Sequence, residues 1–186
     1  MKKEHTFYEL ISTAFGTMGI IWWQAGSRPR VRKTLLRRGA VPVEEVVGQD
    51  YPGALRFSSP PIVQLGNQIR RFLEGEAVVF DLETVALELC GEFQRRVLLA
   101  EHGIPRGWVS TYGRIAKHIG STGAGRAVGT ALAENPFPIL IPCHRAVRAD
   151  GTLGGYQGGK GMKRALLEME GVEFKGAGVS MERVYY

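Results

Sequence analysis

The chain has 186 residues, of which 44% are apolar and 23% charged, and its formal net charge is +6. This composition excludes an intrinsically disordered chain, and the length allows one sizeable domain or two small ones. Two cysteines without a CxxC motif exclude a disulfide framework and a cysteine-rich zinc site, so we expect a cytoplasmic protein.

The excess of basic residues suits a polyanionic partner such as DNA, because lysine and arginine displace the counterions of phosphates. From charge alone, a basic protein with no such partner is equally expected. The apolar run at residues 19–23 is too short to span a bilayer, so no membrane partner is expected.

The first half of the chain predicts a small sheet and one helix. Residues 15–47 mix short apolar runs with turn signals such as Gly26 and Pro29, which predicts strands and a hairpin. Apolar residues at helical spacing predict a helix over 62–73, with prolines in its first turn and a glycine after its end. Residues 77–82 are rich in β-forming types and predict a short strand.

The second half is predicted to be mainly helical. An amphipathic segment that starts near Phe93 and ends near Gly103 predicts the first of its helices. Helices are also expected over 112–119, 124–134 and 160–170, where capping residues and glycines mark the ends. The helices at 112–119 and 124–134, joined by a short glycine-containing turn, have the pattern of a helix-turn-helix. Alone, that pattern is weak evidence for DNA binding, because many helix pairs only pack a core.

The strongest chemical signal is the segment 138–145, in which an apolar run enters a turn that contains Cys143 and His144. A cysteine is nucleophilic as a thiolate, and a basic neighbour is expected to lower its pKa. Adjacent residues of an extended chain point to opposite faces, so contact between this thiol and imidazole needs a turn or a bridging water. The alternative is a buried, inert cysteine beside a surface histidine. Pro142 and the glycine-rich segment 151–159 favour a shaped pocket instead.

The segment Ile141-Pro142-Cys143-His144-Arg145 resembles the active-site motif of the O6-alkylguanine-DNA alkyltransferases. The resemblance is dense from Phe93 to Gly171 and fainter in the first half of the chain. Further segments match in the same order and spacing, namely Phe93-Gln94, Ile104-Pro105-Arg106-Gly107, Thr111-Tyr112-Gly113, Arg126-Ala127-Val128-Gly129, Asn135-Pro136, Gly154-Gly155-Tyr156 and Leu166-Leu167 to Glu170.

The resemblance implies a two-domain architecture. An α/β N-terminal domain with a ribonuclease-H-like small sheet is expected over residues 1–88, and a mainly α domain with a helix-turn-helix over 89–175. The second domain is implied to carry both catalysis and DNA binding. Residues 176–186 are expected to form a loosely held tail.

The resemblance also implies the reaction: single-turnover transfer of an alkyl group from guanine O6 in double-stranded DNA to Cys143, by a monomer without cofactor or metal. His144 is implied to take the thiol proton through a water molecule, and Glu170 to orient the imidazole. Tyr112 is implied to donate a hydrogen bond to the leaving guanine. Asn135 is implied to brace the active-site turn.

The target atom lies inside the base stack, so the nucleotide has to be flipped out. The resemblance implies that the second helix of the pair enters the minor groove and that Arg126 takes the place of the extruded base. Thr111, Tyr112 and Ala127 are the other DNA-binding residues that it implies. The guanine pocket is implied to be lined by Pro138, Ala146, Tyr156, Gln157 and Gly158.

The chain departs from the family pattern at Gly125, where alanine is more frequent, and at Ala146, where valine is. Cys90 lacks a catalytic setting and is expected to be a small core residue. The structural zinc of some relatives is not expected, because no cysteine stands at ligand spacing from His5, His102 or His118.

Two other classes of function compete with alkyl transfer. A non-catalytic sensor would bind alkylated guanine and recruit repair factors, but relatives of that kind lack the acceptor cysteine. A cysteine hydrolase would need an oxyanion hole and repeated turnover, which no other motif of the sequence suggests.

Overall fold

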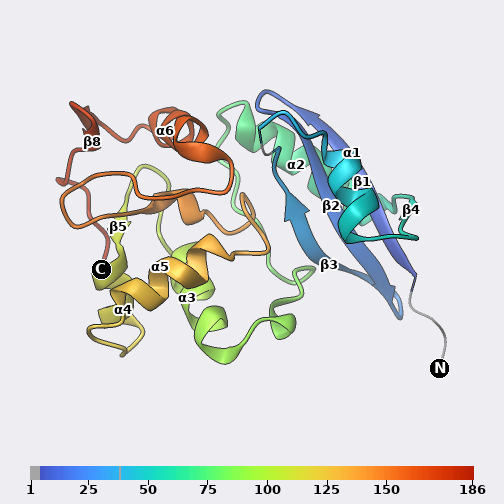
Figure 1. Ribbon diagram of the computed structural model, residues 1–186, viewed down its shortest axis with the longest axis horizontal. Coiled ribbons are helices and arrows are strands. Elements are labelled where there is room, and N and C mark those ends of the chain that lie inside the picture. Colours follow the sequence, from blue (N-terminus) through green and yellow to red (C-terminus); the bar gives the residue numbers. More distant parts are fainter. Residues whose placement is uncertain (1–4, 38) are drawn as a thin grey trace. The chain divides into compact units, whose positions relative to one another are not determined.

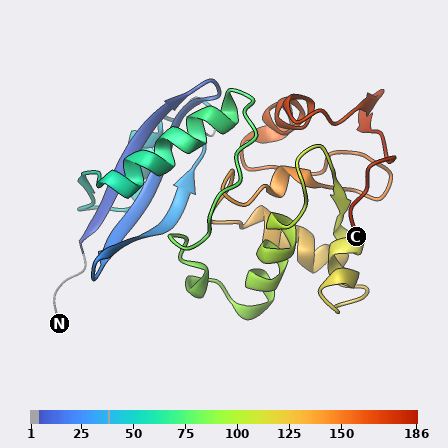
Figure 2. The same cartoon turned by 180° about the vertical axis from the view of Figure 1, so that it is seen from behind.

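The computed structural model describes residues 5–37 and 39–186, shown from two sides in Figures 1 and 2. These residues divide into two units. The first unit comprises the chain up to residue 89 together with residues 136–140, and the second comprises 90–135 and 141–186. No helix of the described ranges combines the length and apolar character needed to cross a membrane.

The first unit is a four-stranded mixed sheet with one helix on each face (Figures 1 and 2). The strand order is β3-β2-β1-β4, with β4 parallel to β1 and the other neighbours antiparallel. Because both faces are covered, the central strand β2 is apolar without alternation. Its elements are β1 (Thr6–Thr13), β2 (Gly16–Ala25), β3 (Arg28–Leu35), α1 (Val43–Asp50), β4 (Leu55–Arg56), α2 (Pro60–Leu73) and the short 3-10 helix η1 (Leu87–Leu89).

The hairpin predicted within 15–47 is confirmed by the antiparallel pairing of β2 and β3, and the helix predicted at 62–73 is confirmed by α2. The prediction of strands over 15–47 is wrong at its C-terminal end, because residues 43–50 form helix α1. Val43 and Val47 stand four residues apart and both pack on the sheet, and two glutamates in the first turn favour the helix N-terminus.

The strand predicted at 77–82 is also wrong, since these residues form no strand. A strand needs a neighbouring strand to bond with. Here residues 84–86, which follow the predicted strand, form the hydrogen bonds with the edge strand β3 instead. The Val31 N–H donates to the Thr84 carbonyl at 2.7 Å, and the Ala86 N–H donates to the Val31 carbonyl at 2.9 Å.

The second unit is mainly helical, as predicted, and its helix α5 packs against both α3 and α4. The helix predicted from Phe93 to Gly103 is confirmed. Its elements are α3 (Glu92–His102), β5 (Ser110–Thr111), α4 (Tyr112–His118), α5 (Gly125–Ala133), the 3-10 helix η2 (Cys143–Arg145), β6 (Ala146–Val147), α6 (Gly159–Met169), β7 (Phe174–Lys175) and β8 (Gly178–Val179).

The end of the chain is not loosely held, contrary to expectation. Val179 is buried within the hydrophobic core of the second unit. The Tyr185 N–H donates to the Val109 carbonyl at 2.8 Å, and the Val109 N–H donates to the Arg183 carbonyl at 3.1 Å. The Tyr186 hydroxyl reaches the last turn of α3, where it donates to the Ala100 carbonyl at 2.8 Å. The buried Val179 and the hydrogen-bonded Tyr186 anchor this segment, which was expected to be loose because it lies at the end of the chain.

Candidate active site

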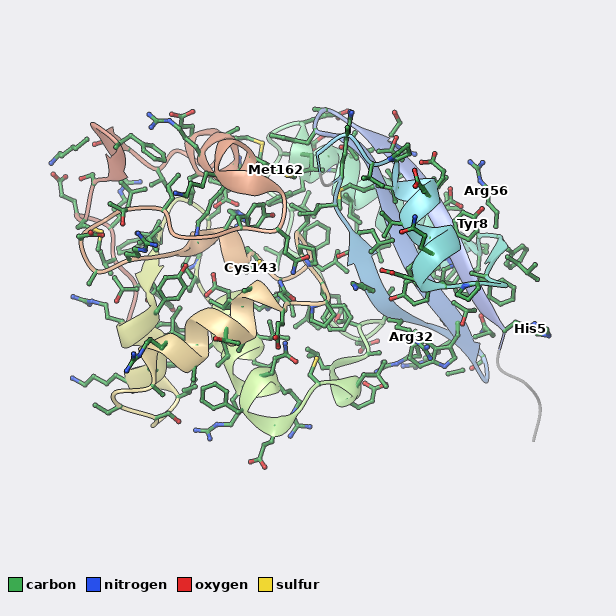
Figure 3. All side chains as sticks on the ribbon, in the orientation of Figure 1. His5, Tyr8, Arg32, Arg56, Cys143 and Met162 are labelled. Carbon is green, nitrogen blue, oxygen red and sulfur yellow. The ribbon has the colours of Figure 1, made fainter. Side chains whose placement is uncertain are left out.

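Cys143 begins the 3-10 turn η2, which packs against helices α3 and α6, and Figure 3 marks its place in the second unit. The Cys143 N–H donates to the Ile141 carbonyl and the Arg145 N–H to the Pro142 carbonyl, both at 2.8 Å. Cys143 and His144 are therefore consecutive residues of one tight turn. Cys143 is 5% exposed and His144 is completely buried.

Asn135 connects this turn to its surroundings. Its side-chain amide donates to the Ile141 carbonyl at 3.1 Å, and Asn135 itself is buried. The Gln157 amide in turn donates to the Asn135 carbonyl at 2.6 Å. The end of α5, the active-site turn and the glycine-rich loop are therefore tied together through one asparagine.

Glu170 is the residue at the C-terminal end of α6, and its carboxylate contacts two side chains of the active-site turn. The His144 Nε2 atom is 3.0 Å from Glu170 Oε1. Arg145 forms a bidentate pair, with Nε 2.8 Å from Oε2 and Nη2 2.7 Å from Oε1. The other guanidinium nitrogen donates to the Ile104 carbonyl at 2.6 Å. The sequence placed Arg145 in the motif, but it did not reveal this anchoring role.

The electrostatics of the network fix the protonation states. Burial acts to raise the pKa of Glu170, but contacts with His144 and Arg145 outweigh it and lower the pKa to about 2. Burial lowers the pKa of His144, against the opposing effect of Glu170. At neutral pH the imidazole is therefore uncharged beside an ionised carboxylate. Its Nε2 proton is directed to Glu170, which leaves Nδ1 as the nitrogen that accepts a proton.

The expectation that its neighbours lower the pKa of Cys143 is wrong for this structure. Burial raises the pKa of the thiol to about 12, although the Asn135 side chain acts to lower it. A sulfur removed from water loses the solvation that stabilises a thiolate. The resting protein therefore holds a protonated thiol beside a neutral base, so deprotonation has to accompany the reaction.

Tyr112 is the first residue of α4, and burial raises the pKa of its hydroxyl. Gly154 lies against that hydroxyl, since a Cβ atom on Gly154 would come within 2.6 Å of it. Gly154 also has φ +68°, a conformation that favours glycine. The glycine-rich loop therefore approaches the Tyr112 hydroxyl more closely than it could if residue 154 had a side chain.

The residues proposed for the guanine pocket do not all fall in one unit. Ala146 is completely buried, and the half-buried Tyr156 ring meets the His144 ring edge-on at 6.2 Å. A Cβ atom on Gly158 would displace the Met162 side chain. Pro138 belongs to the first unit, where its carbonyl accepts the Thr34 hydroxyl at 2.8 Å.

The proposed DNA-binding residues lie at the starts of α4 and α5. Arg126 and Ala127 are exposed in the first turn of α5. Thr111 is buried, and its hydroxyl accepts the Arg114 N–H at 3.2 Å as the N-cap of α4. A Cβ atom on Gly125 would lie 3.5 Å from the backbone of α4, so a small residue here allows the two helices to approach closely. Cys90, expected in the core, is only half-buried.

Comparison with known proteins identifies the family of this site. The family described as 6-O-methylguanine DNA methyltransferase, DNA binding domain, matches residues 92–172. A methylated-DNA–protein-cysteine methyltransferase of Methanothermobacter thermautotrophicus is 50% identical over 121 residues, which cover 64% of this chain and 68% of that protein. The chain belongs to the methylated-DNA–protein-cysteine methyltransferase family. The resemblance seen in the sequence is thus confirmed.

Other members of the methylated-DNA–protein-cysteine methyltransferase family extend the match into the first unit. The Salmonella typhimurium protein is 35% identical over 157 residues, 83% of this chain and 91% of that protein. A crystal structure of Mycobacterium tuberculosis OGT in complex with DNA superposes with a TM-score of 0.70 at 32% identity, covering 88% of this chain and 92% of that one. An N-terminal sheet followed by a mainly helical part is therefore the common architecture.

Proposed function

We propose that this protein repairs DNA by moving the alkyl group of O6-alkylguanine onto the sulfur of its own Cys143. The observation that carries the proposal is a thiol on a tight turn next to a neutral imidazole, His144, whose Nε2 atom is 3.0 Å from the ionised Glu170. This is the arrangement of an activated nucleophile with its base and the group that orients the base. Residues 89–175 carry this chemistry.

The reaction breaks one bond to carbon and forms another. His144 takes the Cys143 proton through a water molecule, and the resulting imidazolium is stabilised by Glu170. The sulfur attacks the alkyl carbon, a C–S bond forms, and the bond from that carbon to guanine O6 breaks. Tyr112 donates a hydrogen bond to the leaving base as negative charge develops on it. The product thioether does not revert to a thiol, so each molecule reacts once.

The guanine becomes accessible after α5 enters the minor groove, with α4 and α5 acting as a helix-turn-helix. The exposed position of Arg126 on the first turn of α5 supports its role in filling the space of the extruded base. Small residues around it let the helix approach the DNA backbone. The sheet of the first unit is, in this proposal, ribonuclease-H-like, and the protein acts as a monomer in the cytoplasm.

Mass spectrometry distinguishes this function from its rivals. The protein is incubated with an oligonucleotide containing O6-methylguanine, and the peptide with Cys143 is weighed. A gain of one methylene per molecule, reached once, supports transfer. Binding with no mass change indicates a sensor instead, and repeated turnover indicates a hydrolase.

Replacing Arg126 with alanine is expected to slow repair of duplex DNA by about tenfold to a hundredfold, because the cost of unstacking a base is a few kcal/mol. Reaction with the free alkylguanine base is expected to be unchanged. The matched control is Arg95→Ala, which removes an exposed arginine from α3, outside the helix pair. Equal loss on both substrates would mean that Arg126 has no part in extrusion.

Replacing Gly154 with alanine is expected to displace the Tyr112 hydroxyl and slow transfer by about tenfold or more, since small misplacements of catalytic groups are costly. The positive φ of Gly154 adds about 1–2 kcal/mol of destabilisation. Rapid-quench transfer assays and thermal unfolding measure the two effects. Gly155→Ala is the control, because a Cβ atom there meets open space. Similar rates for both variants would contradict the role of Tyr112.

A further inference from the structure

The glycine-rich loop is bonded through one side chain to the C-terminal end of α5. The side-chain amide of Gln157 donates to the Ala133 carbonyl at 3.1 Å and to the Asn135 carbonyl at 2.6 Å. The last carbonyl groups of an α-helix have no hydrogen-bond donor within the helix and need one from outside. Gln157 supplies such a donor, and it thereby joins the loop to the helix.

A second glutamine binds the same end of α5 but comes from a different element. Gln94, in the first turn of α3, donates to the Ala131 carbonyl at 3.1 Å and to the Glu134 carbonyl at 3.2 Å. Gln94 therefore joins one helix to another, whereas Gln157 joins a helix to a loop. Because the two amides make the same kind of cap, comparing them separates an effect on stability from an effect on the reaction.

The loop that Gln157 holds contacts two groups that the proposed mechanism uses. Gly154 lies against the Tyr112 hydroxyl, since a Cβ atom on this glycine would come within 2.6 Å of it. The Tyr156 ring meets the His144 ring edge-on, with the ring centres 6.2 Å apart. Gln157 follows Tyr156 directly in the chain, so its two hydrogen bonds restrict where the loop lies beside the proton donor and the base.

The same end of α5 is connected to the turn that carries the thiol. The Asn135 amide donates to the Ile141 carbonyl at 3.1 Å, two residues before Cys143. The opposite end of α5 carries the exposed Arg126 in its first turn. One short helix thus carries the proposed DNA contact at its start, and at its end it is bonded to both the active-site turn and the loop.

We propose that Gln157 is a positioning residue for alkyl transfer, which places the glycine-rich loop by bonding it to the end of the DNA-binding helix. Both N–H groups of its amide are used by carbonyls of that helix end, so it acts through the loop and not by binding the base. Its effect is on where the flipped guanine lies relative to the Cys143 sulfur. DNA is bound at the other end of α5, so the affinity for duplex does not depend on Gln157. This inference rests on the proposed function.

The test uses Gln157→Leu, which removes the donor and keeps a side chain of similar volume. The single-turnover rate constant of methyl transfer at saturating O6-methylguanine duplex is expected to fall about tenfold, because small displacements near the reacting atoms are costly. The rate with the free O6-methylguanine base is expected to fall by the same factor, and the Kd for the duplex to stay unchanged. This pattern differs from that of Arg126→Ala, which is expected to slow the duplex reaction alone.

Gln94→Leu is the matched control, because it removes an equivalent cap from the same helix end and does not touch the loop. Both variants are expected to lower the melting temperature by similar amounts, and rates are compared at a temperature where every protein is folded. Gln94→Leu is expected to keep the wild-type rate constants. An equal loss of rate in the two variants would overturn the proposal, because the cap would then act only on the fold.

Gln157→Arg tests whether the donor itself matters. The Nε–H group of an arginine stands as many bonds from the backbone as the glutamine amide nitrogen, and positive charge is favourable at a helix C-terminus. This variant is therefore expected to recover most of the lost rate. If Gln157→Leu does not fold, Gln157→Glu takes its place, since it keeps the shape of the side chain and has no donor at neutral pH.

Four results would each overturn the proposal: an unchanged rate without the donor, a loss confined to duplex DNA, a raised Kd for the duplex, or an arginine variant that stays slow. Failure of the proposed function is a separate result, namely no mass gain on Cys143 in the wild-type protein.

Discussion

Replacing Cys143 with serine is expected to abolish methyl transfer completely while leaving binding to alkylated DNA unchanged. A hydroxyl is a much weaker nucleophile than a thiol towards saturated carbon, and its proton is harder to remove. The DNA-binding residues lie on α4 and α5, away from this turn in the sequence, and the substitution changes one atom. We expect the free energy of unfolding to fall by about 1–3 kcal/mol, because a hydroxyl is more costly than a thiol to remove from water.

The measurement combines the mass of the Cys143 peptide with a titration of labelled duplex. Cys90→Ser is the matched control, because Cys90 is the other cysteine and lies half-buried outside the active-site turn. That variant is expected to gain one methylene per molecule like the wild type. Transfer by the Cys143 variant would show that another residue accepts the alkyl group. Loss of DNA binding together with transfer would show that Cys143 is structural.

The chemistry of the site was predictable because it is local in the sequence. Cys143, His144 and Arg145 are consecutive, and Pro142 limits the backbone before them. The bonds from Glu170 to His144 and Arg145 could be predicted only in part, through the family resemblance, since the residues are more than twenty positions apart. The protonation state of the thiol could not be predicted, because it depends on burial, which no neighbouring residue reveals.

Glu101 shows a second limit of sequence reasoning. It stands in an amphipathic helix, where a polar residue is normally assigned to the solvent face. Only the packing of α3 against the active-site turn reveals that this carboxyl group is buried. Ile139 is similar, since its φ of 76° is rare for a β-branched residue and is imposed by tertiary structure.

The fold was predictable where periodicity was clear and a partner lay nearby. The hairpin of β2 and β3 and the helix α2 satisfy both conditions. Helix α1 and the segment 77–82 do not satisfy both conditions, because their short apolar patterns fit a strand as well as a helix or a loop. Helix α1 packs on the sheet, and residues 84–86 rather than 77–82 pair with its edge, and both are properties of the assembled unit.

Replacing Glu170 with glutamine is expected to lower the free energy of unfolding by about 3–5 kcal/mol, because the buried Arg145 guanidinium loses its counter-charge. Transfer is expected to slow by about a hundredfold to ten-thousandfold, because an amide neither stabilises an imidazolium nor enforces the Nε2 tautomer of His144. The control is Glu168→Gln, which breaks an exposed pair with Arg164 on the same helix and is expected to cost less than about 1 kcal/mol.

The pH dependence separates the two roles of Glu170. Its pKa in the folded protein, about 2, lies below the ordinary value of 4.5, so its ionisation stabilises the fold above pH 4.5 and that stability is lost as the pH falls towards 2. Denaturant unfolding across this range is therefore expected to show a loss of stability in the wild type that is smaller in Glu170→Gln. Transfer is then compared at a temperature where both proteins are fully folded. A variant that is less stable but transfers at the wild-type rate would limit Glu170 to anchoring Arg145, and His144 would act as a base without it.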